Sequence, residues 1–247
     1  MVGGMNETGA VLFADKRVAR VSAGESRFQH EFGGASLVSS GRRIHRLYQI
    51  DFSDPNVPHV PHLEGLIELF YCFDFREGVI GWFPGAPDRL FFDAEYEFVS
   101  EDEEFPFDNY PLEFPRVPVR VDDCGYDPTD LRDAVAFAGV FGIDELAPAD
   151  YQKALAWQRE YAVRNPAASD AEVVASFCDP LVQECPSWHC LNPECRLFKS
   201  RTSILPFCVV SNDPVKGFYL FEEFGDVQVI FEVCCECGLI LASNQAT

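Results

Sequence analysis

The chain has 247 residues, of which 40 are acidic and 19 basic, and its formal net charge at pH 7 is −21. Charge of this sign repels nucleic-acid backbones and anionic membranes, so a partner that is selected by charge should be basic. Hydrophobic residues make up 47% of the chain and aromatic residues 14%, which provides material for a core and excludes disorder over the whole length.

Cysteine usage and the first residues of the chain predict a reducing compartment. The sequence begins without the basic and apolar regions of a secretory signal peptide, and no apolar run is long enough to span a membrane. Ten cysteines are present, most of them between Cys185 and Cys237. Reduced thiols that bind a metal explain this clustering better than disulfides do, so we expect a cytoplasmic protein.

Alternation of apolar and polar residues with period two predicts strands toward both ends of the chain. The predicted strands cover residues 10–14, 17–22, 44–52, 65–73, 92–98 and 226–233. Glycine pairs at Gly3-Gly4 and Gly33-Gly34 predict turns. Helix signals are confined to the middle, where capping residues and prolines predict helices at about 128–140, 148–164 and 169–177.

These elements predict an α+β fold. Antiparallel twisted sheets from the N- and C-terminal regions would pack with a central helical block, about 128–177, and a zinc-ribbon-like C-terminal element. We expect one domain, 1–247, whose sub-regions are a β-rich half, a helical segment and a zinc-binding β half: 1–125, 126–180 and 181–247.

The two β-rich ends share a sequence pattern. A shift of 160 residues places 65–73 on 225–233 without a gap and aligns 47–50 with 207–210. Each end therefore has a strand, a loop, a glycine and a second strand. Because all strands alternate, this pattern leaves both an internal repeat and a chance likeness open.

Two short cysteine motifs, here called the first and second knuckle, predict one metal site. The first knuckle is Cys190–Cys195, with Asn-Pro in its turn, and the second is Cys234–Cys237, followed by Gly238. Paired thiolates on tight turns are typical ligands of tetrahedral Zn²⁺. The predicted ligands are Cys190, Cys195, Cys234 and Cys237. Cys185 or His189 could replace Cys190, and Cys235 competes on the second knuckle.

Four protein ligands would leave no coordination position for water, so the predicted zinc is structural. From Cys185 to the end of the chain there are four basic and seven acidic residues, which argues against a nucleic-acid-binding ribbon. A second metal at His59, His62 and Glu64 is a weaker prediction than a solvated proline-rich loop.

The sequence favours a non-enzymatic, zinc-stabilised protein that binds another protein. Acidic residues gather between Leu90 and Pro115, above all at Glu101–Glu104, and this run is either a solvated loop or a docking face. A docking face would suit a basic partner, such as a toxin neutralised by an immunity-type protein. No catalytic or cofactor-binding residue is assigned. The alternative is a hydrolase-like enzyme in the groove between the β halves, where Asp51, His59 or His62 could lie.

Residues 30–120 resemble the YwqG-like family of uncharacterised proteins. The resemblance is carried by Leu47-Tyr-Gln49-Ile50-Asp51-Phe52, a proline-bearing loop, Gly65-Leu66-Ile67 and the earlier pair Gly33-Gly34. It implies an α+β fold built on twisted sheets, and it implies no activity.

Overall fold

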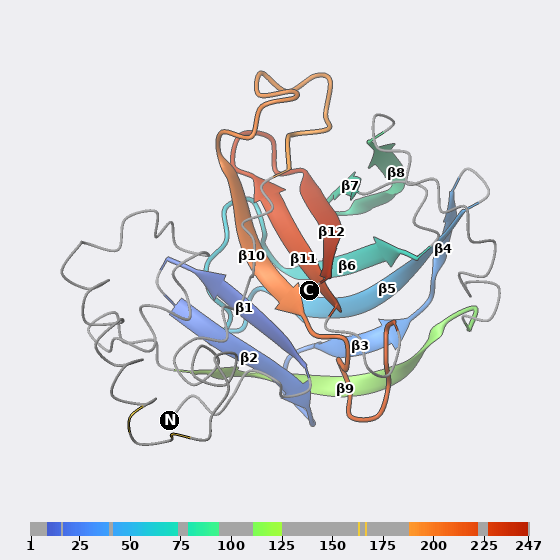
Figure 1. Ribbon diagram of the computed structural model, residues 1–247, viewed down its shortest axis with the longest axis vertical. Coiled ribbons are helices and arrows are strands. Elements are labelled where there is room, and N and C mark those ends of the chain that lie inside the picture. Colours follow the sequence, from blue (N-terminus) through green and yellow to red (C-terminus); the bar gives the residue numbers. More distant parts are fainter. Residues whose placement is uncertain are drawn as a thin grey trace. The chain divides into compact units, whose positions relative to one another are not determined.

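The computed structural model describes residues 9–15, 17–39, 42–73, 79–93, 111–124, 163, 166, 188–221 and 227–246. The elements of these ranges are strands β1 (Ala10–Ala14), β2 (Arg17–Ala23), β3 (Glu31–Gly34), β4 (Leu37–Ser39), β5 (Arg42–Asp51), β6 (Leu66–Cys72), β7 (Val79–Phe83), β8 (Ala86–Phe92), β9 (Phe114–Asp123), β10 (Ile204–Val210), β11 (Val227–Cys234) and β12 (Ile240–Ala246). All of them belong to one compact unit, Thr8–Asp123 with Ser187–Thr247 (Figure 1).

The prediction of an α+β fold with separate sheets is wrong. Every element within the described residues is a strand, and the strands from both ends of the chain join in one 12-stranded sheet. The predicted helical block, about 128–177, lies outside the described residues except for Val163 and Pro166. The single-domain prediction therefore stays a prediction. No described helix is long and apolar enough to cross a membrane.

The sheet follows the order β4-β5-β3-β9-β2-β1-β10-β11-β12-β7-β8, and β6 pairs with β5 beside this path. Each strand pair is antiparallel, which allows one face of the sheet to bury a core while the other faces water. β4 and β8, the strands at the two ends of the order, contact each other. The sheet therefore nearly closes on itself.

The strands can be followed outward in both directions from the β9–β2 pair. Outward from this pair, β3, β5 and β6 follow on one side, and β1, β10 and β11 follow on the other. Pairs β5–β6 and β10–β11 thus occupy corresponding positions in the sheet. Figure 1 shows β5 and β6 side by side, and likewise β10 and β11.

The registers of the two equivalent pairs agree closely. Ile44 lies opposite Cys72, and Ile204 lies opposite Cys234. Both ladders are interrupted by a register shift at the same place, between Arg46 and Tyr48 in β5 and between Pro206 and Cys208 in β10. The ungapped shift of 160 residues holds for the first strand of each pair only. The loop before β11 is longer than the loop before β6, so the second strands are displaced by two residues more.

Period-two alternation divides the side chains of β11 between two apolar clusters. Val229, Phe231 and Val233 enter the large core, which also contains Trp82 of β7 and Tyr48 of β5. Cys234 enters a smaller cluster with Leu239 and Leu241 of the β12 region, and this cluster includes the cysteines. The strand that carries a predicted ligand is therefore fixed by burial on both faces.

Gly33 and Gly34 lie at the end of β3 and do not form the predicted separate turn. Their φ angles are 75° and 103°, values that residues other than glycine rarely adopt. A Cβ atom at Gly34 would overlap the guanidinium of Arg46. That buried guanidinium donates to the carbonyl of Gly33 (2.7 Å) and forms ion pairs with Glu31 and Glu68. The glycine pair makes room for a buried charge that has its partners.

Candidate metal site

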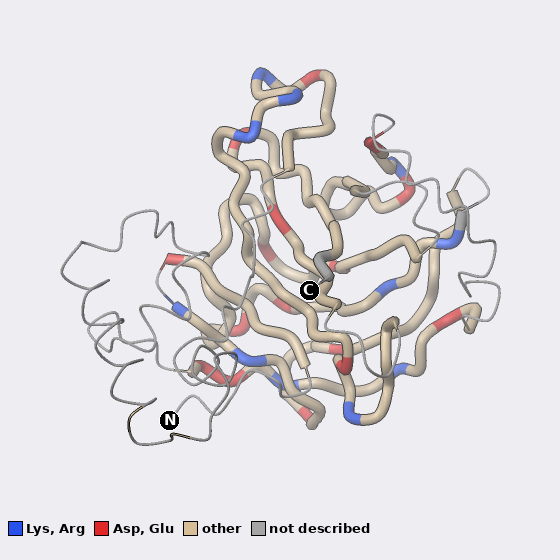
Figure 2. The backbone as a smooth tube through the Cα atoms, viewed as in Figure 1, with Lys and Arg blue, Asp and Glu red and all other residues tan. Residues whose placement is uncertain are grey.

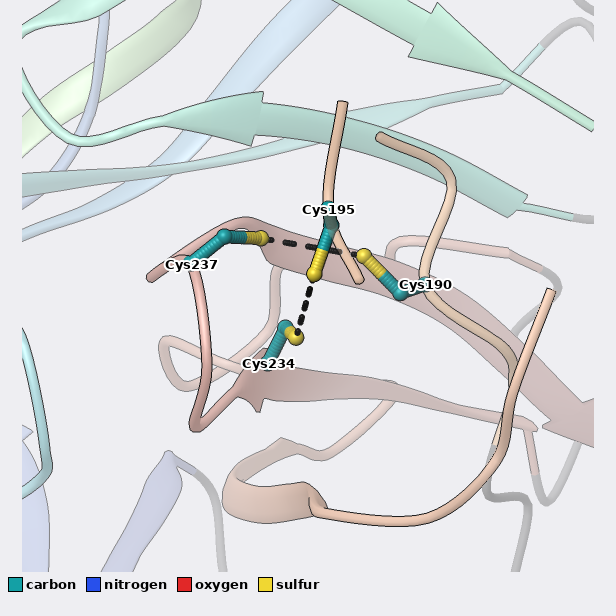
Figure 3. A group of neighbouring side chains, drawn as sticks. All are labelled: Cys190, Cys195, Cys234 and Cys237. Atoms are coloured by element: carbon teal, nitrogen blue, oxygen red, sulfur yellow. Dashed lines mark hydrogen bonds between the residues drawn. The ribbon is translucent and has the colours of Figure 1, made fainter. Parts of the chain in front are cut away.

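The structure brings together the four cysteines that the sequence selected. Cys190 and Cys195 lie in the first knuckle, Cys234 ends β11, and Cys237 lies in the turn before β12. Their four sulfur atoms all lie within 4.8 Å of one another, and the side chains converge on one point (Figure 3). Three of the cysteines are buried and Cys237 is half-buried.

The spacing of the sulfurs fits tetrahedral coordination. A zinc–sulfur bond of about 2.3 Å places the sulfurs of a regular tetrahedron about 3.8 Å apart. The Sγ atoms of Cys190 and Cys237 are 3.7 Å apart, and those of Cys195 and Cys234 are 4.0 Å apart. Each of these contacts joins one knuckle to the other, so one ion at the centre would tie the two knuckles together.

Backbone hydrogen bonds form the turn of the second knuckle. The N–H of Gly238 donates to the carbonyl of Cys234 (2.8 Å), and the N–H of Cys234 donates to that of Leu239 (2.9 Å). Gly238 has a φ of 74°, as the predicted unusual backbone angle at this glycine requires. A Cβ atom there would also lie 2.9 Å from Cβ of His62. Glycine is therefore needed both for its conformation and for the close approach of the β5–β6 loop.

Each sulfur accepts a hydrogen bond from the backbone N–H two residues farther along the chain. The four donors are Asn192, Leu197, Glu236 and Leu239, and their acceptors are Cys190, Cys195, Cys234 and Cys237 respectively. Such bonds orient a sulfur and stabilise its thiolate form. Because the same bond recurs at all four positions, the backbone of both knuckles is arranged for thiolates.

The surroundings of the cluster oppose ionisation of the thiols in the absence of a cation. Burial raises the pKa of Cys190 and that of Cys237 above the ordinary value. Burial acts in the same direction on Cys234, but N–H donors from Cys237 and Glu236 outweigh it and lower the pKa of that thiol. One thiolate is thus favoured, and a bound cation would supply the charge needed to deprotonate the others.

Apolar side chains and one ion pair surround the cluster. Leu191, Ile204, Leu239 and Leu241 are buried against the cysteines. At the surface, Arg196 of the first knuckle donates to Glu236 of the second at 2.6 Å. This pair is largely exposed and contributes little energy, but it joins the same two segments that the sulfurs join.

The alternative ligands lie elsewhere or have other contacts. His189 directs Nε2 toward Asp93 at 3.8 Å, and Cys235 donates its backbone N–H to the carbonyl of Ser203. Neither belongs to the four-sulfur group. Cys185 lies outside the described residues.

The loop that contains His59, His62 and Glu64 contacts the second knuckle. His62 lies at a φ of 65°, and its Nε2 donates to the carbonyl of Cys235 at 2.7 Å. His59 and Glu64 are exposed. Among the described residues, these three do not form a metal-binding group. His62 therefore holds the β5–β6 loop against the knuckle.

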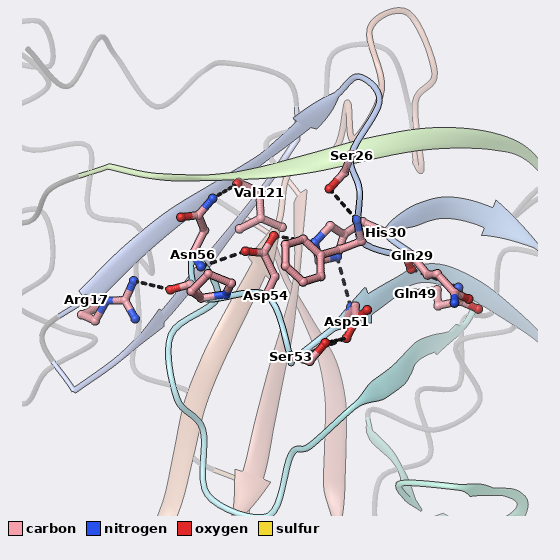
Figure 4. A network of polar contacts seen from close by, with 12 residues as sticks. Arg17, Ser26, Gln29, His30, Gln49, Asp51, Ser53, Asp54, Asn56 and Val121 are labelled. Carbon is pink, nitrogen blue, oxygen red and sulfur yellow. Dashed lines mark hydrogen bonds and ion pairs between the residues drawn. The ribbon is translucent and has the colours of Figure 1, made fainter.

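The sequence did not predict a buried pair formed by His30 and Asp54. The ring of His30 donates from Nε2 to Asp54 at 2.9 Å and accepts at Nδ1 from the N–H of Asp51 at 3.1 Å (Figure 4). Asp54 also accepts from the N–H of Asn56. Because both ring nitrogens are engaged, the pair fixes the start of the β5–β6 loop and leaves no nitrogen for a substrate. The two residues belong to separate irregular segments, so no sequence motif marks them.

A second missed residue, Glu232, lies on β11 two positions before Cys234. It is 1% exposed, and burial raises its pKa to about 8, while a hydrogen bond from the N–H of Trp188 acts in the opposite direction. The carboxyl group therefore holds the segment that leads into the first knuckle. An acidic residue within the alternating pattern of a strand is predicted to face solvent, whereas Glu232 is buried.

Two of the residues that carry the resemblance, Gln49 and Asp51, have local partners. The carboxamide of Gln49 accepts from Arg46 (3.0 Å) and donates to the carbonyl of Gln29 (3.1 Å). Asp51 accepts from the hydroxyl and N–H of Ser53, and the hydroxyl bond lowers the pKa of this carboxyl. Asp51 binds Ser53 and His62 binds the carbonyl of Cys235, so these two side chains have separate partners.

No protein-family model, curated protein or solved structure matches the chain. The resemblance to the YwqG-like family therefore stays a prediction that rests on its motif residues.

Proposed function

We propose that the four cysteines bind one structural Zn²⁺ and that the chain is a non-enzymatic, zinc-stabilised protein with a protein-binding role. The observation that carries the zinc proposal is the set of four sulfurs within 4.8 Å, joined from two knuckles. Four soft thiolate donors in a tetrahedral arrangement favour zinc. They fill its coordination sphere, so the ion stabilises the fold and does not activate water. Reduced thiols imply a reducing compartment such as the cytoplasm.

Metal analysis tests the zinc centre. Protein purified under reducing conditions should contain about one zinc per chain by elemental analysis. Removal of the metal by a chelator under mild denaturation should lower the melting temperature, and added zinc should restore it. A metal-free protein that stays stably folded would refute the centre. Iron in place of zinc would keep the ligands and overturn the identity of the ion.

The partner proposal rests on different residues. The acidic run at Glu101–Glu104 lies outside the described residues, so a basic partner stays a prediction. Reversing these four charges should weaken capture of such a partner, and unchanged capture would remove the acidic face from consideration.

A further inference from the structure

Two close sulfur contacts in the four-sulfur group join one knuckle to the other. The Sγ atom of Cys237 lies 3.7 Å from that of Cys190, and the Sγ atom of Cys234 lies 4.0 Å from that of Cys195. Both contacts are drawn in Figure 3. Sulfurs at these distances can share one metal ion, and they can also bond directly to each other once the ion has left.

The four sulfurs differ in their access to solvent. Cys237 is half-buried in the turn between β11 and β12, whereas Cys190, Cys195 and Cys234 are buried. Coordination by zinc holds each sulfur as a thiolate, and the thiolate is the form that reacts with peroxides. A small oxidant that enters from solvent therefore reaches Cys237 before the other ligands.

Charged residues of both signs lie on the two knuckles. Arg196 of the first knuckle pairs with Glu236 of the second, and Figure 2 shows basic and acidic positions together on the loop of the first knuckle. Hydrogen peroxide is small and uncharged, so these surface charges do not keep it from the sulfurs. Access to the group is then decided by burial, which is least at Cys237.

The spacing of the second knuckle alone suggests a bond within that knuckle. Cys234 and Cys237 are separated by two residues, as in redox-active Cys-x-x-Cys motifs. The sulfur of Cys234, however, accepts hydrogen bonds from the N–H groups of Cys237 and Glu236, whereas Cys190 accepts from the N–H of Asn192. Because such donors stabilise a thiolate, they make it a weaker nucleophile. Cys190, at 3.7 Å from Cys237, is therefore the better attacking group.

We propose that hydrogen peroxide converts the zinc centre into a disulfide between Cys190 and Cys237, with release of the ion. This inference concerns the regulation of the same site and rests on the proposed zinc centre. In the first step, the thiolate of Cys237 attacks the peroxide, releases hydroxide and becomes a sulfenic acid. In the second step, the thiolate of Cys190 attacks that sulfur and releases a second hydroxide as the S–S bond forms. The two sulfurs lose two electrons, and the peroxide takes up both.

The disulfide keeps the two knuckles linked after the ion has left. An S–S bond is about 2.0 Å long, so the two sulfurs approach each other by about 1.7 Å. The thiols of Cys195 and Cys234 remain, and two thiolates fill only half of a tetrahedral zinc site. A covalent link therefore replaces the link through the metal, and reduction of the disulfide restores all four ligands.

Zinc release and disulfide mapping on the full chain test this conversion. Zinc-loaded protein is treated with hydrogen peroxide, and the released ion is measured with a chromogenic chelator. Disulfides are located by tandem mass spectrometry after the free thiols have been alkylated. The bond between Cys190 and Cys237 should appear in step with the loss of about one zinc per chain. A dithiol reductant with added zinc should reverse both changes.

Cys235→Ser is the matched control. Cys235 is half-buried like Cys237, but its sulfur does not belong to the four-sulfur group. This variant should contain zinc, release it at the same rate as the unmodified chain and form the same disulfide. Slower release would make Cys235 the thiol that reacts first and would overturn the proposal.

Two results with the unmodified chain would also overturn the proposal. They are a first disulfide between Cys234 and Cys237, and zinc release without any disulfide between the knuckles. Zinc content is measured on the same samples before oxidation. A metal-free protein that still forms the bond between Cys190 and Cys237 would refute the zinc centre alone, and a zinc-loaded protein that does not form it would refute this conversion alone.

Discussion

The strand pairs β5–β6 and β10–β11 have the same register but end in different chemistry. Isoleucine faces cysteine at both ends, Ile44 opposite Cys72 and Ile204 opposite Cys234. After Cys72 the chain continues into Phe73, whereas after Cys234 it turns through the second knuckle. Equivalent backbone positions therefore do not dictate how the end of a sheet is closed.

Aromatic packing closes the β5–β6 end. The ring of Phe114 stacks on His45, with centroids 4.6 Å apart, and Phe73 packs edge-on against Phe114 at 5.7 Å. Such a cluster forms from the chain alone, each ring pair adding about 0.5–1.5 kcal/mol beyond its burial. The four-thiol end buries smaller side chains and would depend on the proposed zinc ion. The comparison teaches that one strand pair is closed by its own side chains, and that the proposed zinc site would link the stability of the other pair to metal supply.

Loss of a ligand should produce the largest contrast between the two ends. Cys237→Ser should release zinc and lower the free energy of unfolding by several kcal/mol, about 5 or more, because metal binding contributes directly to folding. Elemental analysis and chemical denaturation measure both effects. Cys72→Ser, at the position equivalent to Cys234, and Cys208→Ser should keep full zinc content. Zinc loss in either control would contradict the assignment of ligands.

Truncation of the aromatic cluster should have a somewhat smaller effect and should spare the metal. Phe114→Ala removes a ring that is 2% exposed, and we expect a loss of about 3–5 kcal/mol in the free energy of unfolding. The zinc content of the folded variant should equal that of the unmodified protein. If this variant also lost zinc, the two ends would be one cooperative site and the comparison would fail.

Backbone geometry at the second knuckle can be tested with a matched pair of glycines. Gly238→Ala combines a φ of 74° with a close approach to His62, and we expect it to cost about 2–3 kcal/mol and to weaken zinc retention. Gly65→Ala has a φ of 65° but no neighbouring atom within 4 Å, so it should cost about 1 kcal/mol. Equal losses in the two variants, measured by thermal denaturation, would show that the His62 contact is unimportant.

The smallest expected effect is acid sensitivity at the aromatic end. Burial lowers the pKa of His45 below 6.5, and Arg43 acts in the same direction, against the hydrogen bond to the carbonyl of Pro111. The unfolded chain then binds more protons than the folded chain, so stability should fall as pH decreases below about 6.5. His45→Phe should remove this dependence, and His59→Ala, at an exposed position, should retain it. Denaturation is followed over the pH range in which zinc content is constant.

Local sequence patterns predicted individual strands and the grouping of the four cysteines at one site. Residues 10–14 form β1 as predicted, and β2, β5, β6 and β11 differ from their predicted bounds by one or two residues. The predicted strand 92–98 lies outside the described residues except for Phe92, which ends β8, and Asp93. Alternation and knuckle spacing are local, and they can be recognised without knowledge of the fold. The β3, β4, β7, β9 and β12 strands are short, irregular in pattern or rich in proline and glycine, and they were not assigned as strands. Only residues 207–210 of β10 were predicted as a strand.

Which strands pair with one another could not be predicted, because the local sequence pattern of a strand does not identify its pairing partner. β1 pairs with β10, and β7 pairs with β12, so two strand pairs unite what the sequence presented as separate N- and C-terminal sheets. Buried polar partners were missed for the same reason. His30 meets Asp54, and Glu232 meets Trp188, only after the sheet has formed.

The pairing of β1 with β10 decides when the chain can finish folding. Leu12 lies opposite Cys208, so this side of β1 can pair only after β10 has been synthesised. Until then, the unpaired edge of β1 can pair with the strands of other chains and aggregate. Folding that depends on contacts between residues distant in the sequence is also slow. Cys234 and Cys237 are synthesised later still. All four cysteines of the proposed metal site are therefore available only after β10 has been synthesised.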